Sequence, residues 1–254
     1  MTQRIEDVPA GKNIYFLSDF HLGAPNDAES ALREKKIIRF LNEITPTAHA
    51  VFLLGDIFDF WFEYKYVIPK GFIRLQGKIA QLTDAGIPVY VYTGNHDLWM
   101  FGYLEKELGV TVFYKPIDWE ISGKKFLIGH GDGLGPGDHV YKCTKTVFVN
   151  PFFQWIFRMA PPAIGVGIAQ YWSRKSRQHN ADERFFEEKE FLWQYCTAQD
   201  VAKKRDYYIF GHRHMPLDLK VGEHARYINT GDWIVFDTYA VFDGRALTLE
   251  HWKE

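Results

Sequence analysis

The sequence has few cysteines, no long apolar run and no excess of positive charge. Its two cysteines, Cys143 and Cys196, lie far apart and in no CxxC pair. This argues against a disulfide scaffold or a structural zinc site and fits a reducing compartment. No uninterrupted apolar stretch reaches the ~18 residues that would span a membrane. The opening MTQRIEDVPAGKN is charged and lacks an apolar segment, so we expect no secretory signal and a cytoplasmic protein.

Two further absences narrow the function. The formal net charge is −2 over 254 residues, so no overall basic field indicates a nucleic-acid-binding protein, and we expect no nucleic-acid partner. No GxxxxGK[ST] segment occurs, which excludes a P-loop as the basis of any phosphate chemistry.

The apolar pattern predicts an α/β protein. Buried strands are expected at 13–18, 50–55 and 87–94, with helices over 28–44 and 71–84 between them. The later chain is mostly β, with a hairpin over 119–130 that turns at Ser122-Gly123, and strands at 207–212, 225–231 and 238–250. Early β/α units followed by strands predict a four-layer α/β/β/α sandwich.

One segment departs from this order. No aspartate or glutamate occurs from His139 to Ala181, whereas six basic residues do: Lys142, Lys145, Arg158, Arg174, Lys175 and Arg177. The segment also holds the apolar stretches VFVNPFFQWIF and APPAIGVGIAQYW, and a helix is expected after Asn180 as its N-cap. We therefore expect a helical cap insertion over 141–205, set into a single catalytic domain formed by 1–140 and 206–254.

Polar residues follow the expected strands in a repeated pattern. The strand ends read SDFH, GDIFD, GNHD, GHGD and GHRH, which supply Asp19, His21, Asp56, Asp59, Asn95, His96, Asp97, His130, Asp132, His212 and His214. Side chains at the carboxyl ends of successive strands meet at one edge of a sheet. Each motif alone could be a turn carboxylate beside a surface histidine; all five together favour one shared site.

The residue types predict a metal centre. Aspartate, histidine and a side-chain amide suit Mn, Fe or Zn. A spacing of two in an extended segment would place Asp19 and His21 on the same side, and likewise His212 and His214. Seven ligands exceed one site but suit two ions that share a carboxylate, an arrangement used for displacement at phosphorus.

These motifs resemble the signature of the calcineurin-like metallophosphoesterase superfamily, DxH, GDxxD, GNHD, H and GHxH, and the resemblance spans 19–214. It implies one ion held by Asp19, His21, Asp56 and His214, and a second held by Asp56, Asn95, His130 and His212. It also implies an activated water as nucleophile, with His96 assisting the leaving group or transition state and Asp59 hydrogen-bonded behind it. We expect two divalent ions, Mn²⁺ first, with Fe and Zn as alternatives.

Within the superfamily the chain is similar to the UDP-2,3-diacylglucosamine pyrophosphohydrolases of lipid A biosynthesis, on HGDGLGPGDHVY, RKSRQHN and the apolar insertion. That resemblance implies release of UMP and 2,3-diacylglucosamine 1-phosphate. It also implies substrate contacts from Asn95, His96, Asp138, Ser176, Asn180 and His212. The basic, apolar cap would then bind acyl chains and contact the inner membrane surface peripherally.

Three alternatives stay open. Well-known members of the lipid A group have arginine in the third motif where this chain has His96, so another nucleotide-diphospho-lipid could be the substrate. A soluble phosphodiester or phosphomonoester is a second alternative. A catalytically silent metal-binding scaffold is the third, although all seven ligands and His96 are present. The sequence does not indicate the oligomeric state.

Overall fold

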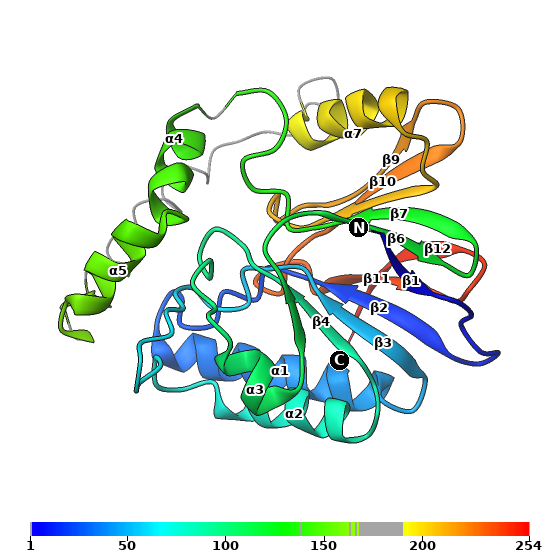
Figure 1. Cartoon of the computed structure of the whole chain (residues 1–254). Coiled ribbons are helices and arrows are strands. Elements are labelled where there is room, and N and C mark those ends of the chain that lie inside the picture. The colour runs from blue at the N-terminus through cyan, green and yellow to red at the C-terminus, as the bar shows by residue number, and fades with distance from the viewer. Residues whose placement is uncertain (1, 138, 163, 166, 168–189, 254) are drawn as a thin grey trace.

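Two six-stranded sheets packed face to face form the centre of the molecule (Figure 1). The computed structural model describes residues 2–137, 139–162, 164, 165, 167 and 190–253. Strand order in what we term the β2 sheet is β12-β11-β2-β3-β4-β5, and in the β8 sheet β1-β6-β7-β8-β10-β9.

The β2 sheet is parallel at its centre. Strands β2 (Asn13–Leu17), β3 (Ala48–Leu53), β4 (Val89–Tyr92) and β5 (Thr111–Phe113) pair in parallel. Strand β11 (Thr238–Phe242) joins β2 in the antiparallel sense, and β12 (Leu247–His251) completes that edge. The carboxyl ends of β2, β3 and β4 therefore lie at one edge of the sheet.

The β8 sheet is mixed. It contains β1 (Gln3–Ile5), β6 (Ile117–Ile121), β7 (Lys124–Ile128), β8 (Tyr207–Phe210), β9 (Pro216–Val221) and β10 (Ala225–Thr230). The predicted hairpin is confirmed, since β6 and β7 pair antiparallel around Ser122 and Gly123, both with positive φ. Strand β8 runs parallel to both β7 and β10, so β7 and β8 also end together.

Aromatic packing joins the two sheets. Phe16 and Phe52 of the β2 sheet stack at 4.9 Å between ring centroids, and Trp119 of the β8 sheet meets Phe52 edge-on at 5.0 Å. Phe126 and Ile209 are completely buried in the same cluster. Because a second apolar cluster covers the outer face of the β2 sheet, its strands are buried on both faces, which explains their continuous apolar sequence.

Helices cover the outer faces (Figure 1). On the β2 sheet lie α1 (Asp27–Ile44), α2 (Ile73–Asp84) and α3 (Tyr103–Leu108). Helix α1 begins after Asn26, whose side chain accepts from the backbone N–H of Glu29. Helix α7 (Phe191–Ala202) packs on the β8 sheet through Leu192 and Cys196. The predicted four-layer α/β/β/α sandwich is confirmed.

The helices α4 (His139–Phe148) and α5 (Pro151–Met159) extend away from the sandwich (Figure 1). Helix α5 starts at an Asn150 cap with Pro151 in its first turn. Phe157 attaches α5 to the sandwich, stacking on Trp99 at 5.1 Å and lying 4.8 Å from Phe62. No helix among the described residues is long and apolar enough to cross a membrane.

The division of the chain at 141–205 stays a prediction. Helix α7 falls inside that range yet packs on the β8 sheet, so its contacts place it with the sandwich. The helix predicted after Asn180 lies outside the described residues.

Candidate metal centre

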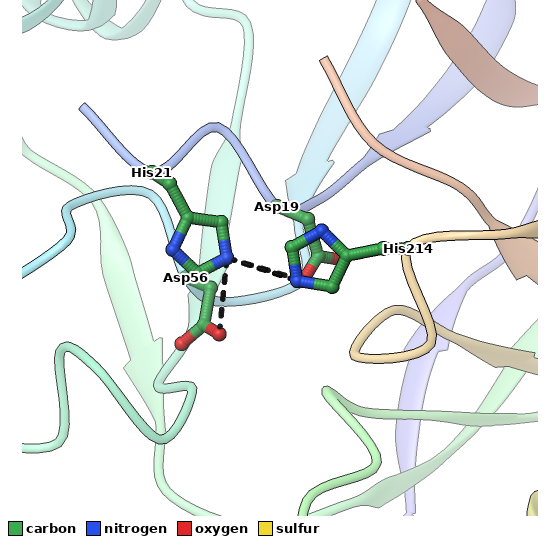
Figure 2. A group of neighbouring side chains, drawn as sticks. All are labelled: Asp19, His21, Asp56 and His214. Atoms are coloured by element: carbon green, nitrogen blue, oxygen red, sulfur yellow. Dashed lines mark hydrogen bonds and ion pairs between the residues drawn. The ribbon is translucent and has the colours of Figure 1, made fainter. Parts of the chain in front are cut away.

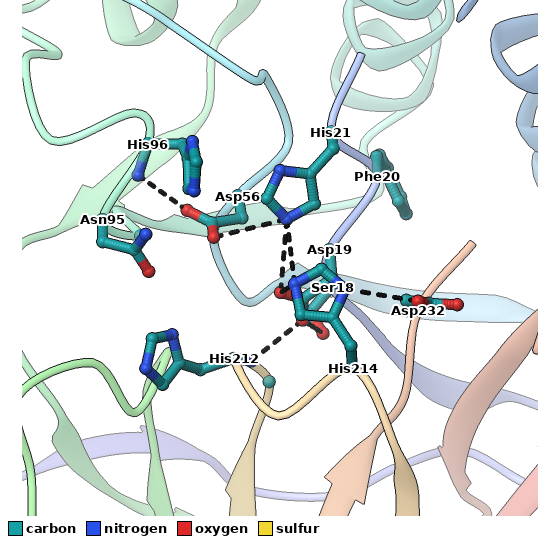
Figure 3. A network of polar contacts seen from close by, with 12 residues as sticks. Ser18, Asp19, Phe20, His21, Asp56, Asn95, His96, His212, His214 and Asp232 are labelled. Carbon is teal, nitrogen blue, oxygen red and sulfur yellow. Dashed lines mark hydrogen bonds and ion pairs between the residues drawn. The ribbon is translucent and has the colours of Figure 1, made fainter. Parts of the chain in front are cut away.

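The strand-end residues of both sheets meet at one place (Figure 3). From the β2 sheet, Asp19 and His21 follow β2, Asp56 and Asp59 follow β3, and Asn95 and His96 follow β4. From the β8 sheet, His130 follows β7, and His212 and His214 follow β8. The site therefore lies where the carboxyl ends of the strands of the two sheets face each other.

One group consists of Asp19, His21, Asp56 and His214 (Figure 2). Nε2 of His21 lies 3.1 Å from Nε2 of His214 and 3.4 Å from Oδ2 of Asp56. Nε2 of His214 lies 3.4 Å from Oδ1 of Asp19. These are the four residues that the family resemblance implies for the first ion.

The second group consists of Asp56, His130 and His212, with Asn95 beside them. Nε2 of His130 lies 3.4 Å from Oδ2 of Asp56 and 3.2 Å from Oδ1 of Asn95. The other ring nitrogen, Nδ1, contacts the carbonyl oxygen of Leu54 at 2.7 Å. Asp56 belongs to both groups, as expected of a bridging carboxylate.

The donor atoms fit divalent cations. Within each group they lie within 4.8 Å of one another. Oδ1 of Asp19 is buried and has no hydrogen-bond partner among the described residues, and it points at the imidazole of His214. A buried carboxylate oxygen without a donor costs free energy unless a cation satisfies it. Carboxylate oxygens and imidazole nitrogens are the usual ligands of Mn, Fe and Zn.

The backbone at this site differs from the expectation of extended segments. Asp19, His21, Asp56, His212 and His214 all have positive φ, between 43° and 70°. The alternation argument for pairs two residues apart was therefore wrong. Asp19 and His21 still lie in one group, whereas His212 and His214 lie in different groups. Left-handed conformations are costly for residues with a Cβ and occur mainly where surrounding contacts enforce them for function.

Glycines allow the loops to approach closely. A Cβ added to Gly94 would overlap the carboxylate of Asp56, and one added to Gly211 would overlap Ser18 and Asp19. A Cβ on Gly55 would overlap the imidazole of His130. Glycine is required before these ligand motifs because the neighbouring loop occupies the space of a side chain.

The charges of Asp56 and His130 depend on each other. Burial opposes the charged form of both groups, but their contact at 3.4 Å outweighs it. The pKa of Asp56 consequently lies well below its ordinary value, and that of His130 rises to about 10. The carboxylates thus attract positive charge to this site, which bound cations would supply in place of protons.

His96 lies beside the two groups. Its backbone N–H donates to Oδ1 of Asp56 at 2.9 Å, and its Nδ1 lies 3.1 Å from the carbonyl oxygen of Asp59. The Asp59 carboxylate lies between two imidazoles, 3.5 Å from Nδ1 of His21 and 3.8 Å from Nδ1 of His96. Burial, together with the neighbouring histidines, lowers the pKa of His96 to about 4. The imidazole of His96 is therefore neutral at pH 7.

Two supporting carboxylates carry no role in the sequence prediction. Asp97 accepts from the backbone N–H groups of Gly94 at 2.7 Å and Ile57 at 2.8 Å, which joins the GNHD loop to the GDIFD loop. Oδ2 of Asp232 lies 3.2 Å from Nδ1 of His214 (Figure 3). Asp232 follows Gly231 at the end of β10, so the pattern of glycine before a polar residue could have identified it.

Three predicted substrate contacts, Asp138, Ser176 and Asn180, lie outside the described residues. The other three, Asn95, His96 and His212, lie in the cluster described above. Substrate contact remains a prediction for all six.

A two-sheet sandwich with clustered aspartates and histidines at its strand ends defines a metal-dependent phosphoesterase. The chain belongs to the calcineurin-like phosphoesterase family, whose model matches residues 12–216.

The similarity to the following known proteins covers nearly the whole chain. A Porphyromonas gingivalis protein named UDP-2,3-diacylglucosamine hydrolase is 37% identical, over 95% of this chain and 98% of the relative. A Stenotrophomonas maltophilia protein of the same name is 29% identical, over 92% of this chain and 96% of the relative. The crystal structure of a dimetal phosphatase from Danio rerio matches with a TM-score of 0.48 at 12% identity, covering 95% of this chain and 96% of that one.

Proposed function

We propose that this protein hydrolyses the pyrophosphate bond of UDP-2,3-diacylglucosamine, releasing UMP and 2,3-diacylglucosamine 1-phosphate in lipid A biosynthesis. The position of Asp56 between two ligand groups carries the proposal for the reaction. The names of relatives that match over more than nine tenths of both chains support the substrate.

Two divalent cations, Mn²⁺ in our proposal, fit the two groups. Asp19, His21, Asp56 and His214 would hold one, and Asp56, Asn95, His130 and His212 the other. When bound, such a pair supplies an activated water and neutralises charge on the phosphate oxygens.

The surrounding residues orient the reacting groups. His96 is neutral and partly buried beside Asp56, so we assign it the donation of a hydrogen bond to the phosphate oxygen or to the leaving oxygen. The Asp59 carbonyl oxygen at 3.1 Å from Nδ1 orients the ring of His96. The Asp59 carboxylate lies within 4 Å of both His21 and His96 and restrains both rings.

The cap suits the lipid part of the substrate. Phe152, Phe153 and Trp155 on α5 are 61%, 45% and 58% exposed, and Arg158 lies on the same helix. Exposed aromatic side chains beside basic ones are typical of surfaces that contact anionic lipid. We propose that the cap binds the acyl chains and contacts the cytoplasmic face of the inner membrane.

Turnover of detergent-dispersed UDP-2,3-diacylglucosamine by the Mn²⁺-loaded protein tests the proposal. We expect UMP to be released, and Asp56→Ala to abolish its release together with metal binding. Hydrolysis of p-nitrophenyl esters without turnover of the lipid would favour a soluble phosphoester as substrate. Unchanged turnover by Asp56→Ala despite a loss of metal would contradict the proposed mechanism.

A second candidate is another nucleotide-diphospho-lipid. The presence of His96 where the well-known lipid A enzymes have arginine favours it, since the imidazole is neutral and reaches less far than a guanidinium. Turnover of CDP- and ADP-linked lipids in the same assay separates the two candidates. The lipid with the preferred nucleotide will be hydrolysed with the highest kcat/KM.

A further inference from the structure

Two ion pairs connect the helices α4 and α7 to the loops that carry histidines of the centre. Asp132, two residues after His130, is 6% exposed, and its Oδ2 accepts from Lys145 Nζ and from the Tyr141 hydroxyl, each at 2.5 Å. Lys145 Nζ also reaches the carbonyl oxygen of Asp132 at 3.2 Å. Tyr141 and Lys145 are one turn apart on α4, so a single face of this helix holds the HGD loop.

The second pair holds the GHRH loop. Arg213 lies between His212 and His214, and its Nε donates to Oε2 of Glu190 at 2.9 Å. Glu190 is 2% exposed and is also the N-cap of α7, where its side chain accepts from the backbone N–H of Leu192. One buried carboxylate therefore fixes both the start of a helix and the loop that carries two histidines.

Phe191 strengthens this connection. The Arg213 guanidinium lies over its ring, 5.1 Å from the centroid, and the ring meets the imidazole of His212 edge-on at 6.2 Å. His212 and His214 both have positive φ, a conformation that surrounding contacts must enforce. Glu190 and Phe191 provide such contacts from α7.

We propose that the Asp132–Lys145 and Glu190–Arg213 pairs are positioning elements of the metal centre, through which α4 and α7 set its affinity for divalent cations. The inference rests on the proposed metal centre. Groups that orient metal ligands without touching the metal typically change affinity or activity by about 10–100-fold when they are replaced. Breaking a buried pair also leaves one charge uncompensated, so the loop that carries it will shift.

Titration of the metal-free protein with Mn²⁺ in a calorimeter tests this proposal. We expect Glu190→Gln and Lys145→Met each to weaken Mn²⁺ binding by about 10–100-fold. Lys145→Arg keeps a positively charged partner for Asp132 and should retain most of the affinity. Glu223→Gln, the same substitution at an exposed glutamate, serves as the control and should bind as the wild type does.

Activity on bis(p-nitrophenyl) phosphate gives a second readout. Because the defect lies in metal affinity, raising the Mn²⁺ concentration about 100-fold should restore the kcat of both variants. Wild-type Mn²⁺ affinity in Lys145→Met and Glu190→Gln, accompanied only by a lower Tm, would overturn the inference. If Glu190→Gln fails to fold, Lys145→Met and Lys145→Arg still decide for the Asp132 pair. Arg213→Gln, which removes the other pair from its cationic side, should then weaken Mn²⁺ binding by about 10–100-fold, and wild-type affinity in that variant would overturn the inference for this pair. Failure of the wild type to bind two Mn²⁺ ions would instead overturn the proposed function.

Discussion

Asp232 uses its two carboxylate oxygens for different contacts. Oδ1 accepts from the backbone N–H groups of Ile234, Val235 and Phe236 at 2.9–3.2 Å, and Oδ2 faces Nδ1 of His214 at 3.2 Å. An ionised carboxylate can only accept, so this network assigns the proton of His214 to Nδ1. The lone pair on Nε2 is then free to face Asp19 and His21.

Asp232→Asn should reverse this tautomer. The amide oxygen will keep the three backbone donors, so the NH₂ group will face His214 and require Nδ1 as an acceptor. The proton then moves to Nε2, and we expect Mn²⁺ affinity or kcat to fall by about 10–100-fold. Calorimetry and steady-state assays measure the loss, with the exposed Asp243→Asn as control. An affinity equal to that of the wild type would show that Asp232 only caps the turn.

Residue types were easier to predict than residue conformations. Glycine before Asp56, Asn95, His130 and His212 marked the ligand loops, because a side chain there would overlap its neighbour. No residue in the sequence indicated the left-handed φ of Asp19 and His21, since aspartate and histidine adopt this conformation only when contacts in the folded chain enforce it. Asp97 was visible within GNHD, but its role depends on the loop that folding brings beside it.

At the scale of elements, strands in long apolar runs could be predicted from the sequence, whereas short strands and helices could not. Strands β2 and β3 were found because both of their faces are buried. Strand β5 and helix α3 were missed, since three and six residues give too little periodicity. Strand β9 begins with Pro216 at a sheet edge and was also missed.

The exposed aromatic side chains of α5 lead to a prediction about the cap. The triple variant Phe152→Gln, Phe153→Gln, Trp155→Gln loses apolar surface for acyl chains, at about 25 cal/mol per Å². We expect KM for UDP-2,3-diacylglucosamine to rise at least about tenfold, a cost of about 1.4 kcal/mol, while kinetics with p-nitrophenyl esters stay unchanged.

Val201→Gln provides the control for this triple variant, since Val201 is 82% exposed on α7, which packs on the β8 sheet. Its KM should match that of the wild type. Equal losses with lipid and small esters in the triple variant would mean that the cap serves folding alone.

At the scale of the whole molecule, the two sheets are connected by apolar packing and by the centre itself. Asp56, which follows β3 of the β2 sheet, contacts His130, which follows β7 of the β8 sheet. Asp19, which follows β2, contacts His212 and His214, which follow β8. Cations bound here would tie the sheets together, so metal binding should contribute to global stability.

Metal removal by EDTA should therefore lower Tm. At free Mn²⁺ about 100 times Kd, one ion stabilises by about 2.7 kcal/mol, which corresponds to about 5–10 °C for a chain of this size. Differential scanning calorimetry measures the shift, and Asp56→Asn should show little of it. An unchanged wild-type Tm, or an equal shift in Asp56→Asn, would contradict binding at this centre.

Asp118 gives a pH dependence of stability away from the centre. It lies on β6 and accepts from Arg205 Nε at 2.6 Å and Lys203 Nζ at 2.8 Å. Burial opposes its charge, but these two donors outweigh burial and lower its pKa below 3.8. A lowered folded-state pKa stabilises the protein above the unfolded value, and this stability is lost as pH falls through the folded pKa.

Asp118→Asn should consequently cost about 1 kcal/mol at pH 7, because the pair is partly exposed. The difference from the wild type should shrink below pH 3.8 and then vanish. Urea unfolding across this range measures it. Glu120→Gln removes an exposed pair on the same strand and should change stability by less than about 0.5 kcal/mol at every pH. A pH-independent cost for Asp118→Asn would contradict the assignment.

The order of the ligands along the chain has a consequence for synthesis. Asp19 is translated early, whereas His212 and His214 come about two hundred residues later, in the loop after β8, the strand flanked by β7 and β10. A nascent polypeptide that has left the ribosome tunnel only as far as β7 would contain three of the four residues proposed for the first ion and two of the four proposed for the second. Hydrolysis can therefore begin only after the remaining residues have emerged and docked, and a chain truncated before residue 212 would be inert.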